Sequence, residues 1–131
     1  MLTTTKVNWK KGFLARCAIW DWYDSEHIYV LGKKGEISLN KWQTLVFHEA
    51  NGNRTIEQMI SWFPSQYKDQ TCIPTGYVDD MLIAAEELLF KIQVVELWER
   101  KDDLAYYFEL PKSEQNEAES LQLMKEDGVV V

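Results

Sequence analysis

Apolar and polar residues alternate along two stretches before residue 40, and a helical spacing replaces this alternation further on. The alternation covers residues 13–22 and 27–39, and its period of two places side chains on the two faces of a strand. The Gly-Lys-Lys-Gly sequence at 32–35 supplies the glycines that a tight turn needs. We therefore expect a long first strand followed by a hairpin. The inner face of that hairpin should carry Ile28, Val30, Ile37 and Leu39.

Two helices with recognisable ends should follow the hairpin. Asn40 and Thr55 are good N-cap residues, and each has a glutamine three residues further on, as in a capping box. Asn51-Gly52 is a typical left-handed stop for the first helix, and Pro64 ends the second.

A third helix is predicted near residues 78–92. Its apolar stripe spans about 120° of arc, while the opposite face carries four acids and one base. Ile83 and Phe90 stand outside the stripe, seven residues apart on one line. Either other elements cover these two residues, or they flank a groove for an extended peptide or a second subunit. The stripe consists of Val78, Met81, Leu82, Ala85, Leu88, Leu89 and Ile92.

The C-terminal third should begin with a second hairpin. Residues 94–99 and 104–110 are β-prone and lie in the position of a wing, whereas 112–131 are polar and are expected to form a disordered or marginally helical tail. With a flexible N-terminus at 1–12, residues 13–111 form one domain. The expected fold class is α+β and winged helix-turn-helix-like: an N-terminal three-stranded antiparallel sheet, three helices and a C-terminal β-hairpin.

The overall charge disfavours nucleic acid as a partner. The 131 residues carry a net charge of −7 with a pI near 4.8, and a negative chain repels phosphate backbones and anionic lipids. The third helix also lacks the Asn, Gln and Arg side chains that read bases. A basic cluster of Lys6, Lys10, Lys11 and Arg16 is interpreted as solubilising surface.

Targeting signals and cysteine pairs are not evident. Residues 1–12 lack the apolar core of a signal peptide, and no apolar run is long enough to span a membrane. We therefore expect a cytoplasmic protein in which Cys17 and Cys72 are reduced thiols, with a disulfide between them left open.

Catalytic and metal motifs are also missing from the sequence. His27 and His48 have no acidic or cysteine neighbours at the spacing of metal ligands. No nucleophile elbow or phosphate-binding loop occurs, and the carboxylate pairs of the third helix are interpreted as a solvated face. We expect no enzyme, no catalytic residue, no metal and no cofactor.

The order of these elements resembles the PqqD-like proteins, the precursor peptide recognition elements of ribosomally made, modified natural products. The resemblance covers about residues 27–93 and rests on the Ser-Leu-Asn sequence at 38–40, the Asn-Gly-Asn-Arg-Thr sequence at 51–55 and the long third helix. It implies a non-catalytic module that binds the leader of a precursor peptide for a modifying enzyme. The leader would add as a strand to the edge of the sheet and contact the third helix.

Transferred by position, the resemblance implies a peptide-binding site on two elements. The strand edge would come from Glu36, Ile37, Ser38 and Leu39, and the helix wall from Asp79, Asp80, Ile83, Glu87 and Phe90. The alternatives are a dimeric winged-helix regulatory or DNA-binding protein and a structural adaptor, and a homodimer stays open in each case.

Overall fold

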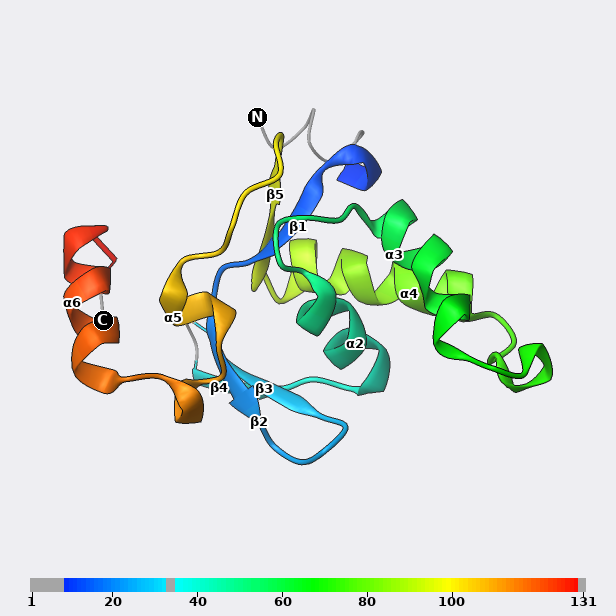
Figure 1. The fold of residues 1–131 in the computed structure, drawn as a ribbon, viewed down its shortest axis with the longest axis horizontal. Helices are drawn as coiled ribbons and strands as arrows, with labels where there is room; N and C mark the ends of the chain where they lie inside the picture. Colours follow the sequence, from blue (N-terminus) through cyan, green and yellow to red (C-terminus); the bar gives the residue numbers. More distant parts are fainter. Residues whose placement is uncertain (1–8, 33–34, 130–131) are drawn as a thin grey trace.

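The computed structural model describes residues 9–32 and 35–129. The expectations for residues 1–8, for the turn at 33–34 and for 130–131 lie outside the described residues. The described chain is an α+β fold with a three-stranded and a two-stranded antiparallel sheet (Figure 1). The strands are β1 (Phe13–Arg16), β2 (Ile19–Trp22), β3 (Ile28–Gly32), β4 (Gly35–Ser38) and β5 (Val95–Trp98). The helices are α2 (Lys41–Glu49), α3 (Ile56–Trp62), α4 (Tyr77–Glu86), α5 (Tyr106–Glu109) and α6 (Glu117–Glu126).

Shorter helical turns connect these elements. A π-helical turn continues α4, and 3-10 turns lie elsewhere in the chain. The π-helical turn is Glu87–Lys91, and the 3-10 turns are Trp9–Lys11, Phe63–Gln66, Gln70–Cys72 and Lys112–Glu114.

The hairpin predicted at 27–39 is confirmed in its register and its buried face. β3 pairs with β4, and Val30 lies opposite Ile37. Ile28, Val30 and Leu39 are buried, and Ile37 packs against the same core. Strand order in this sheet is β2-β3-β4, so β3 is central and β4 is a border strand.

The single strand expected at 13–22 is instead two strands in different sheets. β1 pairs with β5, while β2 pairs with β3. The chain changes sheets at Cys17 and Ala18, where the Cys17 N–H donates to the Val94 carbonyl at 3.0 Å. Both faces of this stretch are apolar because each half packs into its own part of the core.

Both predicted capping boxes are present. The Asn40 side chain accepts from the Gln43 N–H at 2.8 Å, and the Thr55 side chain accepts from the Gln58 N–H at 3.2 Å. Each glutamine side chain returns a bond to the backbone N–H of its cap residue. These bonds satisfy the free N–H groups at the start of a helix.

The third predicted helix is present, but it changes from an α-helix to a π-helical turn at Glu87. Gly76 precedes α4 with a φ of +76°, and the π-helical turn begins at Glu87. The π-helical turn rotates Phe90 off the line of Ile83, since a π-helix has more residues per turn. Of the expected stripe, Met81, Ala85, Leu88 and Leu89 are buried. Val78 is 38% exposed.

The predicted C-terminal hairpin is wrong. β5 pairs with β1, with Phe13 opposite Trp98, and the second expected strand contains helix α5 instead. Carbonyl groups at the end of α5 receive donors from Arg16 and Trp20. This capture explains why local β-propensity did not decide the conformation of 104–110.

The C-terminal segment, expected as a disordered or marginally helical tail, forms a 3-10 turn and helix α6 in the described residues. Asn116 caps α6 by accepting from the Glu119 N–H at 3.0 Å. Met124 is 4% exposed, and the Tyr107 hydroxyl donates to Asp127 Oδ2 at 2.7 Å. Few apolar residues therefore suffice, because α5 supplies a surface for them.

Arg16 links the N-terminal half to this C-terminal segment. Its guanidinium donates to the carbonyls of Phe47 and His48 at the end of α2, and to those of Phe108 and Glu109 at the end of α5. Carbonyls at helix C-termini lack partners within the helix and favour a positive charge.

The environment of Arg16 also changes its ionisation. The side chain is buried and lies over the rings of Trp20 and Phe47. Burial lowers the pKa of Arg16 to about 10, against the opposing effect of Glu49 and Glu109. The group stays charged at neutral pH. The sequence interpretation of Arg16 as part of a solubilising surface is wrong.

Gly52 brings the loop after α2 against β1 and β5. Its N–H donates to the Leu14 carbonyl at 2.8 Å, and its φ is +83°. A Cβ at this position would lie 2.6 Å from both the Asp102 oxygen and the Trp98 ring. Only glycine fits both the backbone conformation and the close approach.

We expect Gly52→Ala to lower the free energy of unfolding by about 2–4 kcal/mol, because it adds a clash to backbone strain. Gly76→Ala is the matched control, since its φ is +76° and nothing lies within 4 Å of the added Cβ. It should cost about 1 kcal/mol. Urea unfolding measures the free energy of unfolding of both variants. An equal loss of stability in the two would contradict the close contact at Gly52.

Tyr107 should make stability fall at high pH. Burial, followed by Asp127, raises the pKa of Tyr107 from 10 to about 12. A raised folded-state pKa stabilises the fold below pH 10, and this contribution is lost as the pH rises to about 12. Tyr107→Phe should cost about 1 kcal/mol at neutral pH and flatten this decline. Tyr23→Phe is the control, because Tyr23 is 69% exposed, and an equal flattening there would contradict the assignment.

Arg16→Met is expected to cost at least about 3 kcal/mol in urea unfolding, because four buried or partly buried carbonyls lose a charged donor. Arg16→Lys should be intermediate, since one ammonium cannot span two helix ends as a planar guanidinium does. Lys11→Met, at an exposed position, should stay within about 0.5 kcal/mol of the parent. Full stability of Arg16→Met would show that the four bonds are dispensable.

Candidate functional site

β4 has one border that no strand in the described part of the chain occupies. The Leu39 N–H donates to the Ile28 carbonyl at 2.8 Å, and Val30 lies opposite Ile37. Hydrogen-bonded pairs alternate along an antiparallel ladder, so the N–H and C=O groups of Glu36 and Ser38 point away from β3. Both residues are exposed. Unpaired groups of this kind are a template for another strand.

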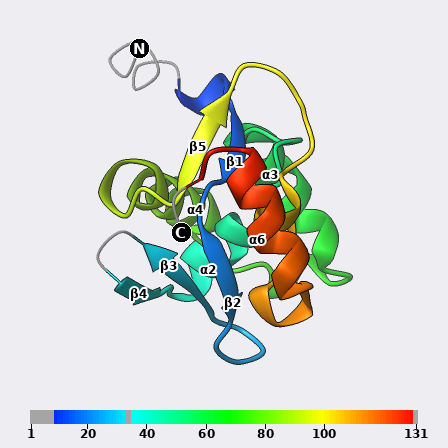
Figure 2. The same cartoon turned by 90° about the vertical axis from the view of Figure 1, so that its left-hand side faces the viewer.

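The opposite border of the same sheet, at β2, is covered. Asp21 accepts from the backbone N–H of Ser113 at 2.9 Å and from its hydroxyl at 3.0 Å. The Trp20 indole donates to the Phe108 carbonyl at 2.9 Å. Figure 2 shows α6 on the β2 side of the sheet and β4 at the far side. Among the described residues, the C-terminal segment lies against the β2 border, whereas no strand pairs with the β4 border.

The predicted wall residues are spread along α4 and the π-helical turn that continues it. Asp79 and Asp80 lie in the first turn of α4, about 10–12 Å along the axis from Glu87 at 1.5 Å per residue. Ile83 is 55% exposed. Phe90 packs edge-on against Trp9, with ring centroids 6.3 Å apart. The two alternatives for Ile83 and Phe90 therefore have different outcomes. An N-terminal element covers Phe90, whereas Ile83 faces outward.

Glu87 is the predicted wall residue that the side chain of Gln43 links to the end of the sheet. Its Oε1 accepts from Gln43 Nε2 at 3.1 Å, and Gln43 Oε1 accepts from the Asn40 N–H at 3.0 Å. Asn40 lies two residues beyond the end of β4. One buried glutamine thus joins the strand end, the start of α2 and the acidic helix.

A hollow of about 490 Å³ lies on the outer side of the π-helical turn. It combines aromatic walls with two carboxylates and one ammonium group. The residues that line it are Trp9, Glu86, Glu87, Phe90 and Lys91. Glu87 therefore belongs both to this hollow and to the hydrogen-bonded chain that reaches Asn40.

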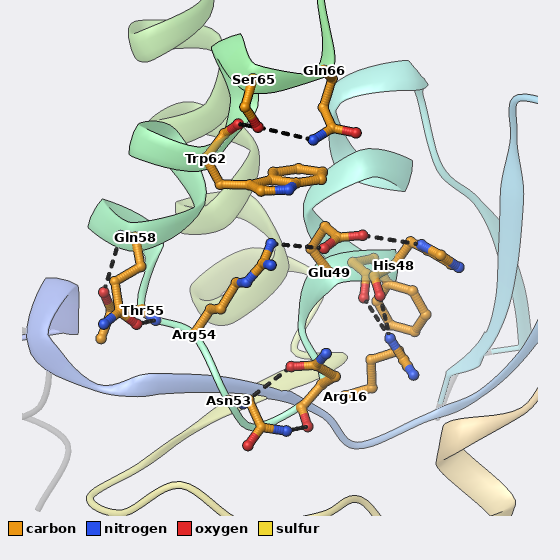
Figure 3. Close-up of polar contacts among 12 residues, drawn as sticks. Arg16, His48, Glu49, Asn53, Arg54, Thr55, Gln58, Trp62, Ser65 and Gln66 are labelled. Carbon is orange, nitrogen blue, oxygen red and sulfur yellow. Dashed lines mark hydrogen bonds and ion pairs between the residues drawn. The ribbon is translucent and has the colours of Figure 1, made fainter.

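A second hollow of about 320 Å³ lies across α2 and includes Trp22 and Trp62. Figure 3 shows a row of side chains beside it, in which the Trp62 ring lies over the Arg54 guanidinium and Arg54 points toward Glu49. Arg54 Nη1 lies 3.2 Å from Glu49 Oε1, and His48 Nδ1 lies 3.4 Å from Glu49 Oε2.

Charges in this second hollow pair with one another. The hydrogen bond from His48 contributes most to lowering the pKa of Glu49, and Arg54 and Arg16 contribute less. Lys41 pairs with Glu26 at 3.3 Å. The charged residues that line this hollow are therefore paired with one another or with Arg54.

The histidines fit structural roles in the described chain. His27 Nδ1 lies 2.9 Å from Asp24 Oδ1, and Asp24 also accepts from the backbone N–H groups of Glu26 and His27. These bonds lower the pKa of Asp24. Among the described residues, no three His, Cys, Asp or Glu side chains form a group that could hold a metal ion.

Comparisons with known proteins find no matching family model, no matching curated protein and no matching solved structure. In the described residues, every helix is too short or too polar to cross a lipid bilayer.

Sequence reasoning missed three residues that shape the site. Gln43 was recognised as a cap residue, but its bond to Glu87 joins positions 44 residues apart and leaves no local signal. Trp9 was assigned to a polar N-terminus. Arg16 had one available signal, since it stands between Ala15 and Cys17 in an apolar stretch, where an arginine needs buried acceptors.

Proposed function

We propose that this protein is a non-catalytic binding module that captures an extended polypeptide segment by strand addition at β4. The observation that supports this most strongly is the contrast between the two borders of the sheet. The C-terminal segment covers β2 through Asp21 and Trp20, whereas β4 directs the backbone groups of Glu36 and Ser38 outward. Proteins normally protect sheet borders, so an open border is consistent with a role in binding another chain.

Main-chain bonds would supply much of the affinity, and neighbouring side chains the selectivity. Two outward residues, Glu36 and Ser38, offer two donors and two acceptors, each bond contributing roughly 1 kcal/mol. Ile37 points to the opposite face and packs on the core. Such an edge suits a guest whose backbone is extended and unpaired.

We further infer that the fold is of the winged-helix type and that the guest is the leader of a precursor peptide, presented to a modifying enzyme in the cytoplasm. The order of a three-stranded sheet followed by α2, α3 and α4 supports this inference, as does the PqqD-like resemblance of 27–93. The wing would not come from 104–110, since that stretch contains α5.

DNA binding through α4 is less well supported. The helix and its π-helical turn carry Asp79, Asp80, Glu86 and Glu87 against Lys91, and carboxylates repel phosphates at short range. Strand addition should depend weakly on salt, whereas binding to phosphates falls steeply with it. This difference separates the two functions in one titration.

We expect Glu36→Pro to weaken binding of a candidate precursor leader peptide by about tenfold or more, because it removes an outward N–H and places a ring at the border. The bonds between β3 and β4 should survive, since Glu36 takes no part in them. Isothermal titration measures the affinity, and amide chemical shifts show whether the variant keeps its fold.

The matched control is Glu57→Pro, a proline in the first turn of α3, where the N–H has no intrahelical partner. It should leave the affinity unchanged. Binding by Glu36→Pro at the parent affinity, or leader-induced shifts that avoid β4, would overturn strand addition at this border.

A further inference from the structure

We propose that the captured segment is basic, and that a lysine or arginine of the guest pairs with Glu87 at the end of the strand site. This inference rests on the proposed function and specifies its partner. It follows from the position of Glu87, the charges around it and the hollow beside it.

Gln43 holds Glu87 in a fixed place before any guest arrives. The Gln43 side chain is 9% exposed and uses its oxygen for the Asn40 N–H and its nitrogen for Glu87 Oε1. The second oxygen of Glu87, Oε2, takes part in no hydrogen bond among the described residues. A carboxylate held by one oxygen presents the other at low entropic cost.

The charges near Glu87 favour a cationic guest. Glu86 also lines the hollow, while Lys91 is the one base among the described lining residues. Asp79 and Asp80 extend the acidic face along α4. Complementary charge increases the association rate and excludes acidic competitors.

The hollow provides room for a long side chain. Its volume is about 490 Å³, and its lining combines two aromatic rings with two glutamates and Lys91. Aromatic walls with adjacent carboxylates suit the stem and the charged end of lysine or arginine. Glu87 therefore both lines the hollow and is bonded, through Gln43, to the residue that follows β4 by two positions.

The test uses three designed peptides, each about eight residues long, that alternate threonine with lysine, with glutamine or with glutamate. We expect the lysine peptide to bind at least about tenfold more tightly than the glutamine peptide at low salt, and the glutamate peptide to bind most weakly. Backbone amide shifts should appear at Glu36, Ser38 and Glu87.

Glu87→Gln removes the charge but retains an oxygen that accepts from Gln43. It should weaken the lysine peptide about fivefold and leave the glutamine peptide unchanged. Glu126→Gln, an exposed position on α6, is the matched control and should change neither. Equal affinity of parent and Glu87→Gln for the lysine peptide would overturn the role of Glu87.

The outcomes separate this inference from the proposed function. If all three peptides shift Glu36 and Ser38 with equal affinity, strand addition stands and the basic guest is refuted. If the lysine peptide shifts only α4 and never β4, or if no peptide binds, strand addition fails as well. A lysine peptide methylated on its backbone nitrogens cannot add as a strand. It should lose the β4 shifts if both proposals hold.

Discussion

The guanidinium of Arg16 is the interaction on which the arrangement of this protein depends. Arg16 lies on β1, and its guanidinium donates hydrogen bonds to carbonyls at the ends of α2 and α5. A buried charge without acceptors would be strongly unfavourable, whereas hydrogen bonds to a charged donor stabilise by about 1.5–3 kcal/mol each. One residue therefore satisfies two helix ends and attaches the C-terminal third to the N-terminal strands.

This attachment gives the three-stranded sheet two unlike borders. With α5 held by Arg16 and Trp20, the chain continues past Ser113, whose backbone and hydroxyl bind Asp21 on β2. The segment that could have been a free tail becomes the cover of one sheet border. β4 receives no such cover in the described chain, and this difference is the basis of the proposed binding role.

The sequence predicted what local chemistry decides. The capping boxes at Asn40 and Thr55, and the inner face shared by Val30 and Ile37, depend on residues close together in the chain. The pairing of β1 with β5 joins residues about 80 positions apart, and nothing in either stretch specifies its partner. The hairpin expected at 94–110 is wrong for this reason. The prediction pairs residues 94–99 with a nearby stretch, whereas β5 pairs with the distant strand β1.

The candidate site was predictable in part for the same reason. The border residues Glu36 and Ser38 followed from the alternation along the hairpin. The helix wall stays a prediction: its residues extend from the first turn of α4 to the π-helical turn, where Phe90 packs against Trp9. The PqqD-like resemblance stays a prediction.

Amide hydrogen exchange of the free protein tests the open border most directly. The account predicts that the amides of Glu36 and Ser38 exchange rapidly, while those of Ile37 and Leu39, bonded to β3, exchange at least about a hundredfold more slowly. Slow exchange at all four positions without any added peptide would show that the border of β4 is already occupied, and would contradict the account.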